Sequence, residues 1–322
     1  MGDLLKVVVT GGAGFIGSHF VRDLLSDERN QFQVVVLDSL TYAGNLRNLQ
    51  DLEIYENFKF FNGDICDPQL PSWIFEDVTS IINFAAESHV DRSIASSAEF
   101  IRTNIQGTHN LLDVALRFQI PKFLQVSTDE VYGSISTGSW NENFPLQPNS
   151  PYASSKASAD LLVRSFNKTH GLHTNITRCS NNFGTHQYPE KLIPVIIEKV
   201  LAGQSIPIYG DGQNQRDWLH VLDHCRGIKS VMLGGDSGEI YNIGGGTELT
   251  NLNLARKIIH IMGASEQLIT FVPDRKGHDH RYSVSFEKIR NDLGYEPLES
   301  INESLAEVVH WYIQNPNWWN KN

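Results

Sequence analysis

Short apolar runs alternate with longer amphipathic stretches through the first half of the chain. The run Leu5–Val9 is followed by a glycine-rich turn and by Ile16–Leu25, where apolar side chains recur at helical spacing. Strands that are apolar on both faces and alternate with helices are typical of a buried parallel sheet. The pattern therefore predicts an α/β fold with a doubly wound parallel sheet. Further strands are predicted at Gln33–Leu37, Phe58–Phe61, Ser80–Phe84 and Lys122–Val126, and further helices at Phe100–Phe118 and Tyr152–Asn167.

The second half of the chain has shorter segments, punctuated by Gly, Pro and Asn. We predict that residues 1–178 form the sheet domain and that residues 179–322 form a smaller mixed α/β domain. Asp223–Leu233 and Glu239–Ile243 have the patterns of a helix and a strand. These segments, near residues 220–245, are expected to return to the first domain.

Composition fits two folded domains and excludes some partners. The chain has 322 residues, of which 40% are hydrophobic and 20% are charged, too apolar for a disordered protein. Asp and Glu number 37 against 26 Lys and Arg, so the formal net charge is −11. An acidic chain of this kind does not favour binding to nucleic acid or to an anionic membrane.

Cysteine usage and hydropathy predict a reducing, cytoplasmic compartment. Cys66, Cys179 and Cys225 lie far apart and form no Cys-x-x-Cys pair, so neither a disulfide framework nor a structural zinc site is expected. The apolar run at Leu5–Val9 is too short for a signal peptide. The sequence contains no apolar run of the roughly 18 residues that a transmembrane helix needs.

Two histidine clusters have loosely metal-like spacing, one at His220 and His224 and one at His278 and His280. His220 ends a predicted strand, whereas His224 lies in the helix that follows. The two side chains therefore need not share a face, and we expect no metal at either cluster.

Gly11, Gly14 and Gly17 follow the first predicted strand and open the first predicted helix. This is the context of a dinucleotide-binding turn, in which glycines permit the bend and the close approach of a pyrophosphate. Asp38 ends the second strand, 21 residues after Gly17. A carboxylate there accepts hydrogen bonds from ribose hydroxyls and repels a 2′-phosphate. The pattern predicts a Rossmann domain that binds NAD in preference to NADP.

Tyr152 and Lys156 are four residues apart on a predicted helix, so both lie on one face. A nearby ammonium lowers the pKa of a phenol and makes it a usable base. Tyr55 and Lys59 have the same spacing, but no strand-end hydroxyl is paired with them. Thr128, at the end of a predicted strand, supplies one for Tyr152.

Asp129 and Glu130 follow Thr128 directly. Two adjacent carboxyl groups in a closed site repel each other, so that one holds a proton at neutral pH and the pair offers an acid and a base. In isolation the same two residues would fit an ordinary polar turn.

The glycine triad, Asp38, Thr128 and the Tyr152–Lys156 pair together resemble the extended short-chain dehydrogenase/reductase family. Over about residues 5–318 the chain looks like the dTDP-glucose 4,6-dehydratases of that family. The segments that carry this resemblance are Ala85–Ser93, Ser127–Gly133, Pro189–Pro194, Arg216–Val221 and Gly277–Asp279.

The resemblance implies conversion of dTDP-glucose to dTDP-4-keto-6-deoxyglucose and water. Tyr152 would take the proton of the 4-hydroxyl as hydride passes from C4 to NAD, with Thr128 on the same oxygen and Lys156 on the ribose. Glu130 would remove the C5 proton, Asp129 would protonate the departing 6-hydroxyl, and the hydride would return to C6.

The resemblance also implies two sets of binding residues. Arg216 and Lys191 have the charge that a diphosphate requires. The residues expected at the cofactor are Gly11, Gly14, Phe15, Ile16, Gly17, Asp38, Asp64, Ile65, Ala85, Thr103, Tyr152, Lys156 and Asn182. Those expected at the nucleotide sugar are Ser88, Thr128, Asn181, Lys191, Leu192, Pro207, Tyr209, Arg216, Asn251 and His278.

One departure from the family pattern is the pair Thr185–His186, where the family usually has Pro and an aromatic residue. The family's loop borders the sugar pocket, so this departure leaves the sugar and base preference open, but not the cofactor or the reaction type. The resemblance further implies a homodimer through helices at residues 98–118 and 152–168. The aromatic tail is expected to pack a final helix; its members are Trp311, Tyr312, Trp318 and Trp319.

Two alternative functions share part of this pattern. A nucleotide-sugar 4-epimerase of the same family would need Tyr152 and Lys156 but would have no use for Asp129 and Glu130. A non-catalytic protein that senses NAD could dispense with Tyr152 or Lys156. Thymidine and uridine remain open as the base of the substrate.

Overall fold

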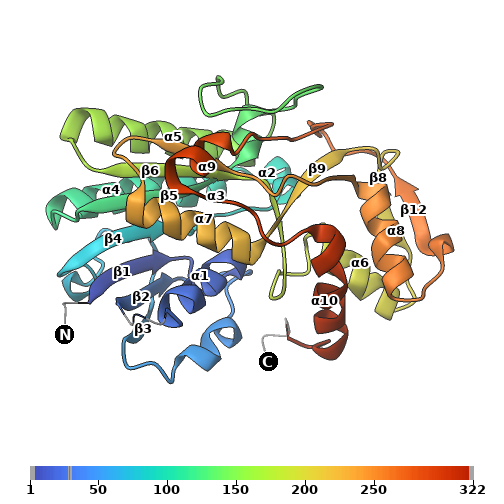
Figure 1. Ribbon diagram of the computed structural model, residues 1–322, viewed down its shortest axis with the longest axis horizontal. Helices are drawn as coiled ribbons and strands as arrows, with labels where there is room; N and C mark the ends of the chain where they lie inside the picture. The colour runs from blue at the N-terminus through green and yellow to red at the C-terminus, as the bar shows by residue number, and fades with distance from the viewer. Residues whose placement is uncertain (1–3, 28, 30, 319–322) are drawn as a thin grey trace.

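The protein is described by a computed structural model that covers residues 4–27, 29 and 31–318. Its largest sheet has seven parallel strands in the order β10-β6-β5-β4-β1-β2-β3 (Figure 1). The strand order reverses beside β1, so the prediction of a doubly wound parallel sheet is confirmed. The strands are β1 (Leu5–Thr10), β2 (Phe32–Asp38), β3 (Phe58–Asn62), β4 (Val78–Asn83), β5 (Lys122–Thr128), β6 (Thr174–Cys179) and β10 (Ile240–Ile243).

Helices connect these strands and cover both faces of the sheet (Figure 1). The long helix predicted from residue 100 is present, but a π-helical segment, η3, occupies its first turns. The longer helices are α1 (Phe15–Leu25), α4 (Thr108–Arg117), α5 (Pro151–His170), α6 (Leu192–Leu201), α7 (Val221–Gly234), α8 (Asn251–Ile261) and α10 (Ile301–Gln314). Shorter ones are η1 (Leu46–Leu52), η2 (Ser72–Ile74), α2 (Val90–Ala95), α3 (Ala98–Phe100), η3 (Ile101–Gly107), η4 (Asp129–Tyr132), η5 (Glu266–Leu268) and α9 (Glu287–Leu293).

Alternate side chains of the central strands fill two separate cores. Val7 and Val9 of β1 pack in one cluster with α1 and α7, whereas Val8 packs in another with α4 and α5. All three valines are at most 1% exposed. Successive residues of a strand point to opposite faces, so a strand that is apolar throughout needs helices on both sides.

The rest of the second half forms a smaller mixed unit beside the sheet (Figure 1). β8 (Ile206–Tyr209) pairs with β12 (Ile269–Val272), and a three-stranded sheet has the order β11-β9-β7. Its strands are β7 (Asn181–Phe183), β9 (Gln215–His220) and β11 (Glu248–Thr250). Apolar side chains of α6, α8 and α10 form a third core around these elements.

Two segments of the second half lie in the large sheet domain. β10 pairs with β6, with Asn242 opposite Arg178, and α7 shares the core cluster of α1. Residue 178 is the penultimate residue of β6, which ends at Cys179. The sheet domain therefore takes chain from both sides of the predicted boundary.

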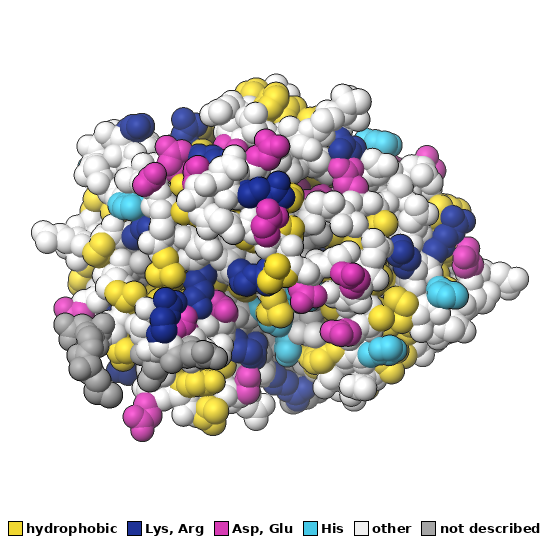
Figure 2. All heavy atoms as spheres, in the orientation of Figure 1, with side chains coloured by type: hydrophobic (Ala, Val, Ile, Leu, Met, Phe, Trp, Pro, Cys, Tyr) yellow, Lys and Arg dark blue, Asp and Glu magenta, His cyan; other side chains and the backbone are white. Residues whose placement is uncertain are grey.

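The surface carries charges of both signs. Figure 2 shows Lys and Arg interspersed with Asp and Glu on one face of the molecule, a distribution that does not favour a long polyanion. Among the residues that the structure describes, no helix combines the length and the hydropathy that a membrane crossing requires.

Candidate active site

A cavity of about 670 Å³ lies between the sheet domain and the smaller unit. The carboxyl ends of β1, β2, β4 and β5 border it, together with residues from α6, β8 and β9. Open α/β sheets bind ligands at the carboxyl ends of their strands, where the strand order reverses. All residues predicted for the cofactor and sugar subsites line this one cavity, as do Asp129 and Glu130.

The glycine loop has the shape that a pyrophosphate cradle requires. A Cβ atom on Gly11 would lie 2.6 Å from the backbone nitrogen of Ala85, and one on Gly17 would overlap the carbonyl oxygen of Gly11. A Cβ atom on Gly14, by contrast, would have only the carbonyl oxygen of Gly11 within 4 Å, at 3.2 Å. Helix α1 begins directly after Gly14 without a side-chain cap, so its first N–H groups suit an anion.

Asp38 ends β2, and its carboxylate organises the loop around it. Its Oδ2 accepts the N–H of Ala13 at 2.9 Å, and its Oδ1 accepts the N–H of Leu40 at 2.8 Å. The residue is 8% exposed and lines the cavity. The carboxylate predicted to bind the ribose therefore also joins the glycine loop to the segment after β2.

Tyr152 and Lys156 lie in the first turns of α5. Ser150 caps this helix by accepting the N–H of Ala153, and Pro151 occupies its first position. The ammonium of Lys156 donates to the carbonyl oxygen of Val126, on β5, at 2.7 Å. The two side chains are 8% and 4% exposed, respectively.

The pKa of Tyr152 moves in the direction opposite to the one expected. Burial raises the pKa of the phenol well above its ordinary value, and the carboxyl group of Glu130 raises it further. A hydrogen bond with Thr128 acts in the other direction. In this structure the ammonium of Lys156 donates to the carbonyl oxygen of Val126, and the buried phenol lies beside carboxyl groups, so its pKa is raised and not lowered as predicted. The lowering of the pKa that the mechanism requires stays a prediction for the occupied site.

Asp129 and Glu130 occupy η4, the turn that follows β5. Thr128 caps this turn: its hydroxyl accepts the N–H of Glu130 at 3.3 Å and donates to Oδ1 of Asp129 at 3.3 Å. Asp129 is 2% exposed, and its Oδ2 accepts no hydrogen bond from the described residues. Burial raises the pKa of Asp129 well above its usual range, and Glu130 raises it further. Asp129 is therefore expected to hold a proton at neutral pH.

Glu130 has a different electrostatic environment. Burial raises its pKa, but the cations Lys191 and Arg216 act against that increase. The cations thus favour the carboxylate of Glu130, whereas burial and a like charge favour the acid form of Asp129. Two neighbouring carboxyl groups whose environments differ in this way can serve as one acid and one base.

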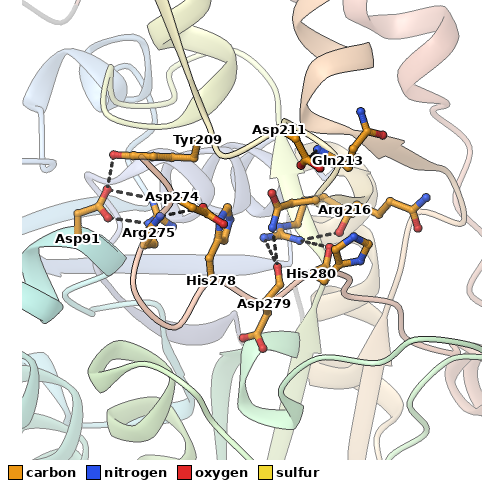
Figure 3. A network of polar contacts seen from close by, with 12 residues as sticks. Asp91, Tyr209, Asp211, Gln213, Arg216, Asp274, Arg275, His278, Asp279 and His280 are labelled. Carbon is orange, nitrogen blue, oxygen red and sulfur yellow. Dashed lines mark hydrogen bonds and ion pairs between the residues drawn. The ribbon is translucent and has the colours of Figure 1, made fainter. Parts of the chain in front are cut away.

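Arg216 and Lys191 are both anchored by backbone oxygens. The guanidinium of Arg216, on β9, donates to the carbonyl oxygens of Asp279 at 2.9 Å and His280 at 3.3 Å (Figure 3). Lys191, just before α6, donates to the carbonyl oxygen of Ser88 at 2.8 Å, which links the two halves across the cavity. Burial lowers the pKa of Lys191, and Glu190 and Glu130 oppose that shift.

The neighbouring asparagines are held differently. Asn182 is fixed by His224, whose Nδ1 lies 2.9 Å from its Oδ1. Oδ1 of Asn181 is buried and accepts no hydrogen bond from any described residue, so this oxygen is free for a ligand donor. Within the described part of the chain, no group of three His, Cys, Asp or Glu side chains converges to hold a metal.

Arg275 lines the cavity but was not among the predicted residues. Its guanidinium pairs with both carboxylate oxygens of Asp91, at 2.6 and 2.9 Å, and lies over the ring of Tyr209 (Figure 3). His278, which was predicted, pairs instead with Asp274 at 2.6 Å. In the sequence, the only indication that Arg275 lies at the site was its position three residues before the predicted site residue His278.

The Thr185–His186 pair does not line the cavity, although its neighbour Gln187 does. His19 lies 3.1 Å from the carbonyl oxygen of Thr185, and the ring of His186 packs 4.4 Å from that of Trp311. The loop thus borders the cavity through Asn182 and Gln187, whereas the side chains of Thr185 and His186 point away from it. The aromatic tail packs as expected at Trp311, Tyr312 and Trp318, whereas Trp319 lies outside the described residues.

Comparison with known proteins agrees with this geometry. A family model described as GDP-mannose 4,6 dehydratase matches residues 8–308. A dTDP-glucose 4,6-dehydratase from Streptomyces niveus is 51% identical over 318 residues, covering 98% of this chain and 95% of that protein. The chain belongs to the dTDP-glucose 4,6-dehydratase family.

Solved structures place this dehydratase chain within a wider fold. DesIV, a dTDP-glucose 4,6-dehydratase from Streptomyces venezuelae with NAD and TYD bound, matches with a TM-score of 0.96 at 51% identity, over 98% of this chain and 99% of that chain. A UDP-glucuronic acid 4-epimerase from Bacillus cereus also matches, with a TM-score of 0.90 at 28% identity over 97% and 100% of the two chains. The fold alone therefore does not distinguish dehydration from epimerisation.

The environment of Asp129 makes the stability of this dehydratase dependent on pH. A carboxyl whose pKa is higher in the folded than in the unfolded state costs stability as pH rises between those two values. Asp129→Asn removes that cost. We expect its free energy of unfolding to rise relative to wild type as pH increases above about 4, the ordinary pKa of a carboxyl group, by about 1.4 kcal/mol per unit of pKa difference.

Urea unfolding at several pH values measures this difference, with Glu53→Gln as a control at an exposed carboxylate. A relative stability of Asp129→Asn that stays constant or falls with rising pH would contradict the protonated state of Asp129.

Proposed function

We propose that this protein is a nucleotide-sugar 4,6-dehydratase that converts dTDP-glucose to dTDP-4-keto-6-deoxyglucose and water. The observation that carries the proposal is the pair of the buried Asp129 and the half-buried Glu130, which lines the same cavity as the Tyr152 phenol. Moving a hydride at C4 requires one base, whereas removing water also requires an acid and a second base. A 4-epimerase would not need the two carboxyl groups of Asp129 and Glu130.

NAD is the proposed cofactor, and the cavity suits it. Backbone N–H groups at the start of α1 would bind the pyrophosphate, beside the open position at Gly14. Asp38 would accept hydrogen bonds from the adenosine ribose, and Lys156 would bind the other ribose. When bound, NAD accepts a hydride from C4 of the sugar and later returns it to C6, so no external reductant is consumed.

The residues of the chain itself move the protons. Tyr152 takes the proton of the sugar 4-hydroxyl, with Thr128 bonded to the same oxygen. The 4-ketone acidifies the C5 proton, which Glu130 removes and gives back to C5 when the hydride returns to C6. Asp129, whose pKa is raised by burial and by Glu130, gives its proton to the 6-hydroxyl, and that group leaves as water. The separate environments of the two carboxyl groups support this division of roles.

Cations on the far side of the cavity would bind the diphosphate. Arg216 presents a planar fork of donors, and Lys191 a compact positive charge. Arg275 extends this set, since its guanidinium already binds a carboxylate in the cavity wall. The sheet domain would then hold mainly the cofactor, and the smaller unit mainly the nucleotide of the sugar.

A direct assay tests the proposed function. The purified protein, incubated with dTDP-glucose and catalytic NAD, is expected to form the 4-keto-6-deoxy sugar, which is detected by its absorbance in alkali. UDP-glucose in a parallel reaction tests the base preference. Absence of product from a protein that still binds NAD would contradict the proposal.

Replacing the proposed base separates oxidation from elimination. Glu130→Gln is expected to lower kcat by at least about 100-fold, because the C5 proton has no acceptor, while oxidation at C4 proceeds. Nicotinamide absorbance should therefore rise in a single turnover without formation of the sugar product. Glu53→Gln, at an exposed position, is the control. Normal turnover by Glu130→Gln would show that another group is the base.

We further propose a cytoplasmic homodimer. The three cysteines are all unpaired and buried, as suits a reducing compartment. The helices expected at the interface expose large apolar side chains: Ile101 on η3 and Leu161 on α5 are each 54% exposed. Such side chains on one surface favour a contact with a second copy of the chain.

A charged side chain introduced at this surface tests whether the protein dimerises through it. Leu161→Glu is expected to weaken association at least about tenfold, because a desolvated carboxylate at an apolar contact costs binding energy. Sedimentation equilibrium measures the change, with Ile54→Glu, at an 80% exposed side chain, as the control. A wild type that is monomeric, or a Leu161→Glu protein that dimerises normally, would contradict the proposal.

A further inference from the structure

The groups proposed for catalysis come from two separate elements. Tyr152 and Lys156 lie on α5, whereas Asp129 and Glu130 lie on η4. The chemistry requires these side chains to meet one sugar ring in register, and an error of about 1 Å in such a site can cost 100-fold in rate. The two elements therefore need a rigid connection.

Arg178, on β6, connects them from behind the cavity. It is 1% exposed, and it does not line the cavity itself. Its Nε donates to Oδ2 of Asp160, on α5, at 2.9 Å, and its Nη1 donates to the hydroxyl of Tyr132, on η4, at 2.8 Å. The guanidinium also lies 4.8 Å from the ring centroid of Tyr132. One buried side chain thus binds both elements.

The connection continues to the edge strand of the sheet. The Tyr132 hydroxyl donates to Oδ1 of Asn242, on β10, at 2.9 Å. The backbone N–H of Asn242 donates to Glu142 at 2.8 Å, and its side-chain amide donates to the carbonyl oxygen of Trp140 at 3.1 Å. The position of Tyr132 is therefore fixed by two buried partners that themselves have partners.

Asp160 also faces the proposed catalytic lysine. It lies one helical turn after Lys156 on α5, and it is completely buried. Burial lowers the pKa of Lys156, and the carboxylate of Asp160 acts against that decrease. Asp160 therefore stabilises two buried cations, Arg178 by a direct ion pair and Lys156 through its charge.

We propose that Arg178, Asp160 and Tyr132 form a positioning network that holds the acid pair of η4 in register with Tyr152 and Lys156 of α5. These three are positioning residues, since they act through the catalytic groups. The inference rests on the proposed function. It assigns a role in catalysis to a buried ion pair that could otherwise serve stability alone.

Tyr132→Phe is the sharpest test, because it removes only the hydroxyl that joins Arg178 to η4. Elimination, which uses the acid pair, should slow about tenfold, whereas oxidation at C4 and the KM for the sugar should change less than about twofold. Reduced nicotinamide should therefore accumulate in a single turnover. Tyr241→Phe is the matched control: Tyr241 is 1% exposed on β10, and among the described residues its hydroxyl accepts only the backbone N–H of Asp236.

Asp160→Asn separates positioning from stability. If one network positions both elements, the effects of the two substitutions should not multiply. The elimination rate of the double variant Tyr132→Phe/Asp160→Asn should then lie within about twofold of that of the slower single variant. Thermal unfolding of each variant provides a readout that does not depend on turnover. Should Asp160→Asn fail to fold, Tyr132→Phe alone decides the question.

The inference is overturned if folded Tyr132→Phe eliminates water at the wild-type rate, or if oxidation and elimination slow equally. Multiplicative losses in the double variant would overturn it as well. These results differ from a failure of the proposed function, in which the wild-type protein itself forms no 4-keto-6-deoxy sugar.

Discussion

The structure depends on keeping two adjacent carboxyl groups out of water. Asp129 and Glu130 follow directly on a buried central strand, and the smaller unit closes over them with Lys191 and Arg216. In water both groups would be ionised and equivalent. In the cavity wall, burial raises the pKa of both groups, and Glu130 raises that of Asp129 further. Lys191, Arg216 and Arg275 oppose the increase at Glu130, so the two groups become unequal. That inequality allows one turn of the chain to supply both an acid and a base.

The burial of charge also explains why the two halves must pack together. Lys191 reaches across the cavity to the backbone of Ser88, and Arg275 pairs with Asp91 of α2. Each contact joins the smaller unit to the sheet domain at the rim of the cavity. A chain with a net charge of −11 thus still places Lys191, Arg216 and Arg275 in the wall of one cavity.

Dehydratase and epimerase neighbours share this architecture at TM-scores of 0.96 and 0.90. The fold is therefore shared by proteins that carry out different reactions on nucleotide sugars. Under the proposed function, the acid pair on η4 adapts this fold to the loss of water. Its support lies behind the cavity, where Arg178 links η4 to α5 without touching the substrate space.

The sequence alone determined the parallel sheet, since strands such as Leu5–Thr10 are apolar on both faces and require helices on both sides. It also identified the glycine loop and the Tyr152–Lys156 pair, because their spacing within one element fixes their geometry. Only the tertiary structure decided the burial of the Tyr152 phenol beside carboxyl groups, the place of Thr185–His186 outside the cavity, and the contacts of Arg275 and Arg178. These depend on burial and on contacts between residues far apart in the chain, and no local spacing encodes such contacts.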